Sequence, residues 1–437
     1  MICKKVLVIG GAGRFGSLLI EDLRRSAECE VVAPGRHAVD LQDPVSIDAA
    51  LAGISVAICA AGPFQTLPTT LAEGCMQHGV HYIDLADDRS FVKKVRSLTA
   101  STGVGGPSDS PMREAGEAGV PSVGRTVGPT LARISHRLPR ETAETPRRQG
   151  ARPRPPQAYS TVRRGGRPSA TQYPRAYRPF REATGEECGL GRAGDPPAVC
   201  TGWSTVSALS GSLVRIGAAG LERIEEIYIH MAPGNRLARG NGTIASLLHS
   251  VGRPLSIWRD GRWQTVTGWS APRRFSFPPP IGVRSGYLVD APDHDLFPEL
   301  FGARTVEFRA ASELPFLNAA VSFLGWLARR RVVRSWAPWS RILGGLAALP
   351  ASMGHDWGGI GVEVLGWSRD RRVSRRACVV AHSGGQRIAV MPASIMTSML
   401  LSGSTHRGLA SPADWITHEQ LRLECEKRGF QLIVEEP

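Results

Sequence analysis

The chain has 437 residues, 42% of them hydrophobic, and carries 53 lysines and arginines against 39 acidic residues. This length is enough for two or three domains with substantial cores, and the hydrophobic content is typical of a globular protein. A net charge of +14 favours an anionic partner. However, no nucleic-acid-binding motif or aromatic ladder accompanies the charge, so we expect no nucleic-acid partner.

The first predicted element is a strand over residues 6–9, which is short and apolar throughout, as in a strand buried on both faces. Gly11, Gly13 and Gly16 follow as Gly-x-Gly-x-x-Gly, and apolar residues then recur at helical spacing. We predict a tight turn at Gly11, close approach of a pyrophosphate at Gly13, and close helix–strand packing at Gly16. Strand, turn and helix together predict dinucleotide binding at the helix N-terminus, against the alternative of a glycine turn without a ligand.

The second predicted strand, residues 30–33, has no acidic residue at its tip to bind an adenosine ribose 2′-hydroxyl. Arg36 follows shortly after it, and a guanidinium suits a 2′-phosphate in charge and geometry. Asp40 lies further past the strand and is the less favoured ribose ligand. The sequence therefore favours NADP over NAD, unless Arg36 is simply a solvated surface residue.

Two more apolar strands are predicted over residues 55–61 and 81–86. Ligands bind at the carboxyl ends of parallel strands, so the loops that follow are candidates for the site. After the first strand, Gly62-Pro63-Phe64 combines a glycine that admits a ligand with a ring that would wall the nicotinamide. The second strand carries Asp84, a structural cap or ribose ligand, and leads to Asp87.

The composition changes between residues 101 and 198, which contain 16 Arg, 14 Pro, no Lys and 9 acidic residues. This segment supplies half of the net charge and shows neither helical nor alternating periodicity. Three interpretations compete: a disordered basic insert that binds an anionic partner, a flexible linker, or out-of-frame translation of a GC-rich gene. The abrupt edges of the segment favour aberrant sequence.

Beyond this segment, residues 199–204 are expected to complete the nucleotide sheet, and residues 222–230 alternate as a half-solvated strand. A glycine-rich loop with Arg236 and Arg239 then precedes a helix predicted over 243–250. The loop is either an anion site, suited to a substrate carboxylate or phosphate, or a connecting turn. No residue stands out as the catalytic acid or base.

The apolar stretches 314–328 and 342–353 fall short of the roughly 20 residues needed to cross a bilayer, so no transmembrane segment is expected. Arg329, Arg330 and Arg331 lie between them. The region is either a buried helix with an exposed basic end or a segment on a membrane surface.

The eight cysteines show no Cys-x-x-Cys pair and no metal-ligand spacing with histidine. The first apolar run is also too short for a signal peptide. We therefore expect no metal and a cytoplasmic location.

Three segments resemble the NADP-binding domain of saccharopine dehydrogenase-like oxidoreductases: GGAGRFG, AAGPFQ and GVHYIDLADD. The resemblance resumes at residues 201–211 and 232–248, and recurs at 356–366 and 391–403. The basic segment has no counterpart in the family, and Ser207 stands where a proline is usual.

This resemblance implies an α/β protein with a Rossmann-type doubly wound parallel sheet and a second α+β domain that closes over the nicotinamide. The expected division is 1–100 (nucleotide domain), 101–198 (basic segment), 199–221 (return to the nucleotide domain), 222–403 (substrate domain) and 404–437 (C-terminal helical segment).

The implied reaction is hydride transfer between NADP(H) and a carbon–nitrogen or related centre of a small anionic metabolite. The alternative is a non-catalytic NAD(P)-binding sensor or scaffold, and homodimerisation stays open. The residues assigned to the cofactor are Gly11, Gly13, Arg14, Phe15, Gly16, Arg36, Ala61, Gly62, Pro63, Phe64 and Asp84. Those assigned to the substrate are Asp87, Arg236 and Arg239.

Overall fold

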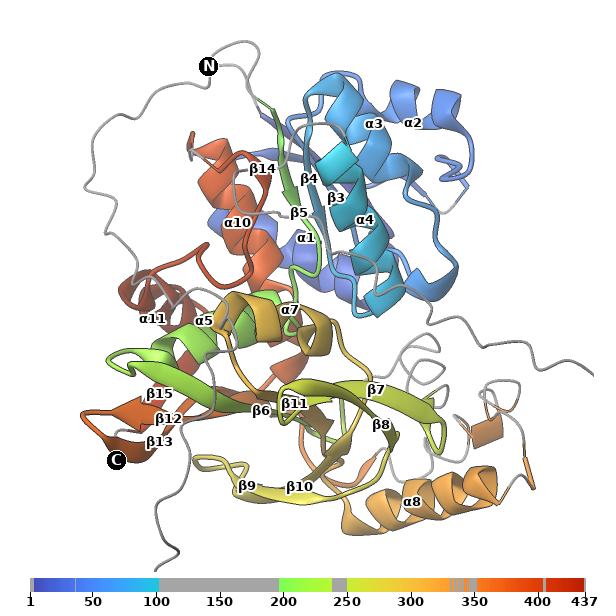
Figure 1. Ribbon diagram of the computed structural model, residues 1–437. Helices are drawn as coiled ribbons and strands as arrows, with labels where there is room; N and C mark the ends of the chain where they lie inside the picture. The colour runs from blue at the N-terminus through green and yellow to red at the C-terminus, as the bar shows by residue number, and fades with distance from the viewer. Residues whose placement is uncertain are drawn as a thin grey trace, which may run out of the picture. The chain divides into compact units, whose positions relative to one another are not determined.

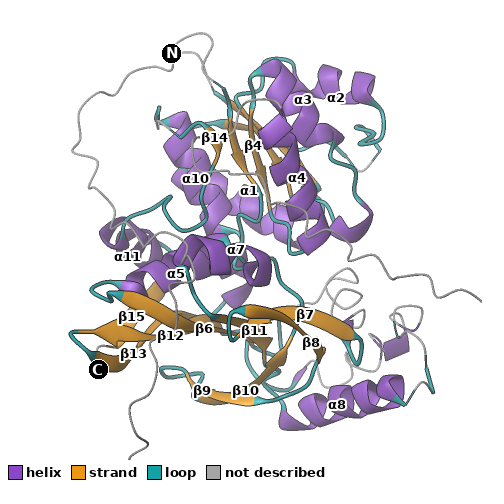
Figure 2. Cartoon of the chain, in the orientation of Figure 1, coloured by secondary structure: helices purple, strands orange, loops and turns teal. Residues whose placement is uncertain are grey.

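The structure is a computed structural model that describes residues 4–35, 37–101, 196–237, 250–330, 352–403 and 406–435, with a few residues between 332 and 345. The described residues belong to one compact unit. They form two β-sheets with helices packed on their faces (Figures 1 and 2). Apart from its ends, the basic segment lies outside them.

The first sheet is parallel throughout, with the strand order β14-β5-β4-β3-β1-β2. Its strands are β1 (Lys5–Ile9), β2 (Glu30–Val32), β3 (Val56–Cys59), β4 (His81–Asp84), β5 (Ala198–Cys200) and β14 (Gly408–Leu409). All four residues of β3 are buried, because helices cover both faces of the sheet. The α/β class and the doubly wound parallel sheet predicted from the sequence are confirmed.

The helices of this layer are α1 (Arg14–Ser26), α2 (Pro44–Leu51), α3 (Thr70–His78), α4 (Arg89–Ser101) and α10 (Met391–Leu401), with a short 3₁₀ turn η1 (Phe64–Thr66). α1 packs against α10 on one face, and α2 packs beside α3 on the other. Eight of the 11 residues of α10 are buried, and the helix packs on β3 and β4, so this element from near the end of the chain completes the core of the nucleotide sheet.

The second sheet is mixed, with the order β15-β13-β12-β6-β11-β10-β9, and β7 pairs with both β11 and β8. Its strands are β6 (Arg223–Pro233), β7 (Pro254–Arg259), β8 (Arg262–Thr267), β9 (Arg273–Ser276), β10 (Val283–Leu288), β11 (Thr305–Ala310), β12 (Gly358–Ser368), β13 (Arg371–Ala381) and β15 (Phe430–Glu435). The accompanying helices are α5 (Ala208–Ala218), α7 (Asp293–Phe301), α8 (Pro315–Arg329), α11 (His418–Lys427) and the 3₁₀ turn η4 (Gly385–Ala389).

One face of the second sheet is apolar and packs toward the nucleotide sheet. Ile227, Ile229, Val306 and Phe308 belong to a hydrophobic cluster that also includes residues of the nucleotide sheet. α5 and α7 pack on these strands. A single core therefore spans both sheets.

The C-terminal segment contains more strand than its sequence pattern predicts. Besides α11, it contains β14, which extends the nucleotide sheet, and β15, which pairs with β13 in the second sheet. β15 is one half-buried edge strand, and such a strand becomes stable only through its partner.

Asp84 ties together strands that lie far apart in the sequence. Its buried Oδ1 accepts hydrogen bonds from the backbone N–H of Ala86 (2.9 Å) and of Gly202 (2.8 Å). Burial, only partly offset by these donors, raises the pKa of Asp84 to about 6. The carboxylate thus serves as the structural cap that joins the end of β4 to the turn after β5.

Ser207, directly before α5, has a backbone conformation that proline could not adopt. Its φ is +66°, a value that the pyrrolidine ring excludes. Its hydroxyl donates to Asp293 at 2.9 Å, and the Ser210 hydroxyl donates to the same carboxylate at 2.7 Å. α5 is therefore anchored to α7.

Arg89, the first residue of α4, binds elements of the second sheet. Its guanidinium donates to both carboxylate oxygens of Asp295, to Asp290 at 3.0 Å and to the Ser256 carbonyl at 2.7 Å. Only 17% of the Arg89 side chain is exposed. This fork-shaped contact fixes α4 to α7 and β7.

We expect Arg89→Met to lower the free energy of unfolding by about 2 kcal/mol, because Asp295 would lose its partner in a half-buried site. Urea denaturation followed by tryptophan fluorescence measures this change. The control is Arg422→Met, since Arg422 pairs with two glutamates on the exposed side of α11 and should change little. Equal effects of both variants would contradict the role given to Arg89.

Replacing Asp84 tests its raised pKa. The folded protein binds this proton more tightly than the unfolded chain does, so the contribution of Asp84 to the stability of the wild type should fall as the pH rises from about 4 to 6. Asp84→Asn keeps an acceptor without the charge, so its stability relative to the wild type should increase over that range. Asp84→Ala should cost about 2 kcal/mol, because two backbone N–H groups lose their acceptor. A constant difference between Asp84→Asn and wild type from pH 4 to 8 would contradict the raised pKa.

Candidate functional site

The strand order creates a crevice beside β1. β2 and β3 pair with opposite edges of β1, so the chain reverses its direction across the sheet there. In doubly wound sheets, ligands bind outside the carboxyl ends of the strands at this reversal. The loops that follow β1 and β3 meet there: a Cβ on Gly10 would lie 2.6 Å from the backbone nitrogen of Ala61.

In the structure, the glycines of the turn have roles that differ from those predicted from the sequence. Gly10, not Gly11, takes the left-handed conformation, with φ +83°. Gly11 is required for another reason, since a Cβ there would lie 2.8 Å from Ile20 Cδ1 and 2.9 Å from Ala33 Cβ. A Cβ on Gly16 would overlap the carbonyl oxygen of Gly10. In the sequence, the doublet Gly10-Gly11 indicates that the turn contains one more glycine than the Gly-x-Gly-x-x-Gly pattern requires.

The N-terminus of α1 follows directly after this turn. No side chain caps the helix at Gly13, and its first turn has no acidic residue. The first N–H groups and the positive end of the helix dipole therefore stay available to an anion. Arg14 is exposed, and its Nε donates to Gln386 at 2.7 Å, whereas Phe15 is half-buried against the core.

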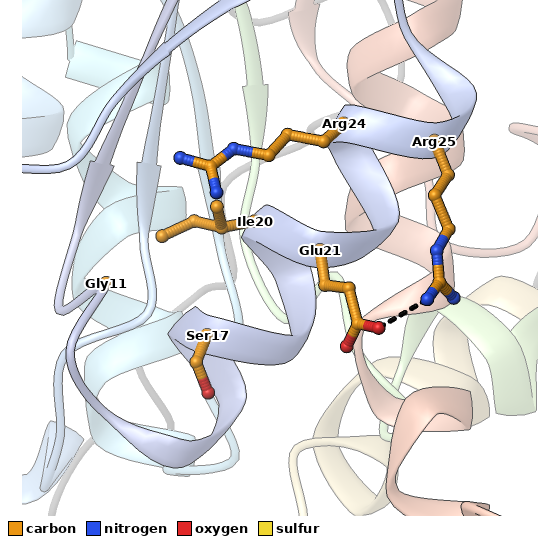
Figure 3. A pocket seen from close by; sticks show the side chains of 6 residues that line it. All are labelled: Gly11, Ser17, Ile20, Glu21, Arg24 and Arg25. Carbon is orange, nitrogen blue, oxygen red and sulfur yellow. Dashed lines mark hydrogen bonds and ion pairs between the residues drawn. The ribbon is translucent and has the colours of Figure 1, made fainter.

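An open groove runs from the glycine turn along α1 (Figure 3). Its volume is about 420 Å³, and it is lined by Gly11, Ser17, Ile20, Glu21, Arg24 and Arg25. Glu21 accepts from Arg25, whereas Arg24 extends past Ile20 on the other side (Figure 3). Arg24 is thus an exposed cation of this groove that the sequence analysis missed. Arg36 lies outside the described residues.

The loop after β3 divides into a surface part and a buried part. Gly62 and Pro63 are exposed beside the glycine turn, and Ala61 is half-buried. Phe64 is buried, and its ring lies 5.1 Å from that of Phe91 in α4. The ring predicted to wall the nicotinamide therefore packs within the domain.

The acidic residues after β4 have separate roles. The Asp84 carboxylate already accepts two backbone N–H groups. Asp88 directly precedes α4, and its carboxylate accepts from the Phe91 N–H in the first turn at 2.9 Å. Asp87 lies between them and is the most exposed of the three.

In the second domain, the loop after β6 meets the segment before β12. Arg236 is exposed, and its Nε donates to the Ser352 carbonyl at 3.0 Å. Next to it, the Glu313 carboxylate accepts from the N–H groups of Asn235 (2.7 Å) and His355 (3.0 Å). Arg239 and the helix predicted over 243–250 fall, except for the last residue, among the residues that the structure does not describe.

His355 and Glu313 form a pair with one buried and one accessible member. Nδ1 of His355 lies 2.7 Å from Glu313 Oε1, and the side chains are 67% and 7% exposed, respectively. Hydrogen bonds from His355 and from the Asn235 N–H outweigh burial and lower the pKa of Glu313. A carboxylate that holds one imidazole nitrogen leaves the other free to exchange a proton.

A short series of contacts connects this pair with the glycine turn. Asp356, next to His355, accepts from the Gly384 N–H at 3.0 Å, and its carbonyl accepts from the Gly385 N–H at 2.8 Å. The following residue, Gln386, accepts from Arg14 at the start of α1. No sequence pattern marks Glu313 or Gln386, because the two residues acquire their hydrogen-bond partners only in the folded chain.

Within the part of the chain that the structure describes, no group of three or more His, Cys, Asp and Glu residues is arranged to hold a metal ion. The groups present at this edge are helix N–H groups and arginines, which bind anions, and an imidazole, which exchanges a proton.

No protein-family model matches this sequence, and comparison with curated proteins gives no match. Similar solved structures include an engineered D-amino acid dehydrogenase bound to NADP⁺, with 11% identity, a TM-score of 0.40, and 94% of each chain covered. A C. glutamicum DAP dehydrogenase in complex with DAP has 11% identity and a TM-score of 0.39, covering 95% of this chain and 94% of that one. An amine dehydrogenase from Mycobacterium smegmatis has 9% identity and a TM-score of 0.37, covering 94% and 96%.

Proposed function

We propose that the chain is an NADP(H)-dependent oxidoreductase similar to saccharopine dehydrogenase-like enzymes, acting on a small anionic metabolite. The observation that carries this proposal is the turn from Gly10 to Gly16, placed at the reversal of the sheet with an uncapped helix N-terminus behind it. Close packing at Gly10, Gly11 and Gly16 keeps the turn tight and leaves the exposed Gly13 and the helix N-terminus open to a dinucleotide.

The cofactor pyrophosphate would bind the N–H groups of Arg14 and Phe15, since the Gly13 N–H already donates to the Gly10 carbonyl at 2.8 Å. Gly62 and Pro63 would border the same ligand, since their loop lies against Gly10. Arg36, and Arg24 in the groove beside Gly11, are the cations proposed for the 2′-phosphate. When bound, NADP(H) supplies or accepts the hydride.

The substrate would lie toward the second domain. Arg236 offers a cation for a carboxylate at the edge where β6 ends, with Arg239 proposed beside it and Asp87 on the side of β4. Contacts from Asp356 to Gly384 and from Gln386 to Arg14 support placing this edge beside the cofactor site.

His355 is the proposed proton acceptor or donor, and Glu313 is its positioning residue. Transfer of a hydride to or from a carbon–nitrogen or carbon–oxygen centre requires a proton at the heteroatom. The Glu313 carboxylate fixes the tautomer of His355 so that Nε2 exchanges this proton, with Nδ1–H donating to the carboxylate.

Fluorescence titration with NADPH and with NADH tests the cofactor. We expect NADPH to bind at least about tenfold more tightly, because contacts with a charged phosphate contribute on the order of 1–3 kcal/mol. Arg36→Gln and Arg24→Gln should each reduce this preference, whereas Arg371→Gln, on exposed β13, should leave it unchanged. Absence of binding by either nucleotide would refute the proposal, and binding without turnover would favour a sensor or scaffold.

Turnover of NADPH with ammonium and a panel of 2-oxo acids tests the proton pair. His355→Asn should lower kcat by about 10²-fold or more and remove the imidazole-dependent limb of its pH profile. Glu313→Gln should have a smaller effect on kcat, since the imidazole would keep a hydrogen-bonding neighbour but lose the carboxylate that orients it. His382→Asn, an exposed histidine after β13, is the control. An unchanged profile in His355→Asn would exclude this residue as the proton group.

A further inference from the structure

Helix α8 carries an apolar stripe on its outer face. Phe316, Phe323 and Trp326 are 50%, 58% and 44% exposed, and the alanines between them, Ala319 and Ala320, are exposed as well. Their spacing of three to four residues places them along one side of the helix. The stripe is therefore continuous, unlike the single exposed apolar residues that are common on protein surfaces.

The opposite face of α8 is already used for packing. A Cβ on Gly252 would lie 2.6 Å from Ala328 Cβ and 2.7 Å from the Gly325 carbonyl oxygen, so the helix contacts the backbone before β7 closely. Asn318 is buried, and its side chain accepts from the Ser312 N–H at 3.0 Å. Rotating the helix to bury the stripe would break these contacts.

The stripe ends in positive charge. Arg329 and Arg330 are exposed at the C-terminus of α8, and the Arg330 guanidinium lies 5.5 Å from the ring centroid of Trp326. The rings of Phe323 and Trp326 stack with their centroids 5.9 Å apart. Up to Arg329, α8 contains no charged residue. Exposed apolar side chains continue beyond it at Val332, Trp339 and Ile342, which are 67%, 49% and 59% exposed.

The dimensions of α8 suit a helix that lies on a bilayer. Fifteen residues span about 22 Å at 1.5 Å per residue, which is less than the roughly 30 Å of a bilayer core. Among the described helices, none reaches the length and apolar content that a membrane span needs. Aromatic rings beside arginines are the side chains that partition to the headgroup region.

We propose that the exposed face of α8 docks on an anionic lipid surface, with Phe316, Phe323 and Trp326 inserted below the headgroups and Arg329 and Arg330 beside the phosphates. Charge selects this occupant over a second copy of the chain. α8 has no acidic residue, so an identical face would offer these arginines no partner. The inference is independent of the proposed oxidoreductase activity.

Co-sedimentation of the full chain with vesicles tests the apolar part. We expect binding to vesicles of phosphatidylcholine with phosphatidylserine, and at least about tenfold weaker binding of Phe323→Ser/Trp326→Ser, because two large rings lose their buried area. Val45→Ser is the control, since Val45 is 73% exposed in the nucleotide layer. The basic segment 101–198 is present in every variant, so a difference between them reports on α8.

A second comparison tests the charges. Arg329→Gln/Arg330→Gln should weaken binding to the same vesicles by about fivefold per arginine, with a smaller effect in high salt. The control, Arg262→Gln/Arg371→Gln, removes the same charge from exposed positions of the second sheet. Circular dichroism and Tm establish that each variant is folded.

Two results would overturn the proposal. One is equal vesicle binding by the wild type and Phe323→Ser/Trp326→Ser. The other is a wild-type dimer, seen by light scattering, that becomes monomeric in this variant while neither protein binds vesicles, since a second copy would then cover the face. NADPH titration of the same variants separates these outcomes from failure of the cofactor site, which lies in the other layer.

Discussion

The contact between Gly16 and the carbonyl of Gly10 is the constraint on which the nucleotide layer depends. Any side chain at residue 16 would overlap that oxygen. Only glycine there lets α1 begin at Arg14, so soon after β1 ends at Ile9. The same Gly10 lies against the backbone at Ala61, which brings the loop after β3 to the turn. Close backbone packing, rather than a particular side chain, therefore opens the helix N-terminus toward the reversal of the sheet.

Buried polar contacts then hold the second sheet against this layer. Arg89 binds α7 and β7 from α4, and Asp293 of α7 accepts the hydroxyls of Ser207 and Ser210, which follow β5 of the nucleotide sheet. These groups are expensive to bury alone, so each is stable only with its partners in place. The edge that carries His355 is linked to the start of α1 by other contacts, through Gly384 and Gln386, and the proposed function depends on that link.

The polar edge that carries Arg236 and His355 lies in a different part of the second domain from the apolar stripe of α8. The edge presents arginines and an imidazole, and it lies beside η4, which contacts α1. α8 instead packs on the segment before β7 and leaves three aromatic rings in solvent. A surface site on α8 and a nucleotide site at Gly13 could therefore operate in one molecule without competing for residues.

The sequence by itself determined the parallel nucleotide sheet, because fully apolar runs such as residues 6–9 and closely spaced glycines have few other stable arrangements. It also indicated the dinucleotide turn and the absence of an acid at the tip of β2. Only the tertiary structure decided that Gly10 carries the positive φ, that Phe64 packs on Phe91, and that Asp84 caps the turn after β5. The tertiary structure likewise pairs Glu313 with His355, adds β14 to the first sheet and packs α10 on that sheet. The physical reason is the same in each case: these roles depend on partners distant in the sequence, and no local pattern encodes such distances.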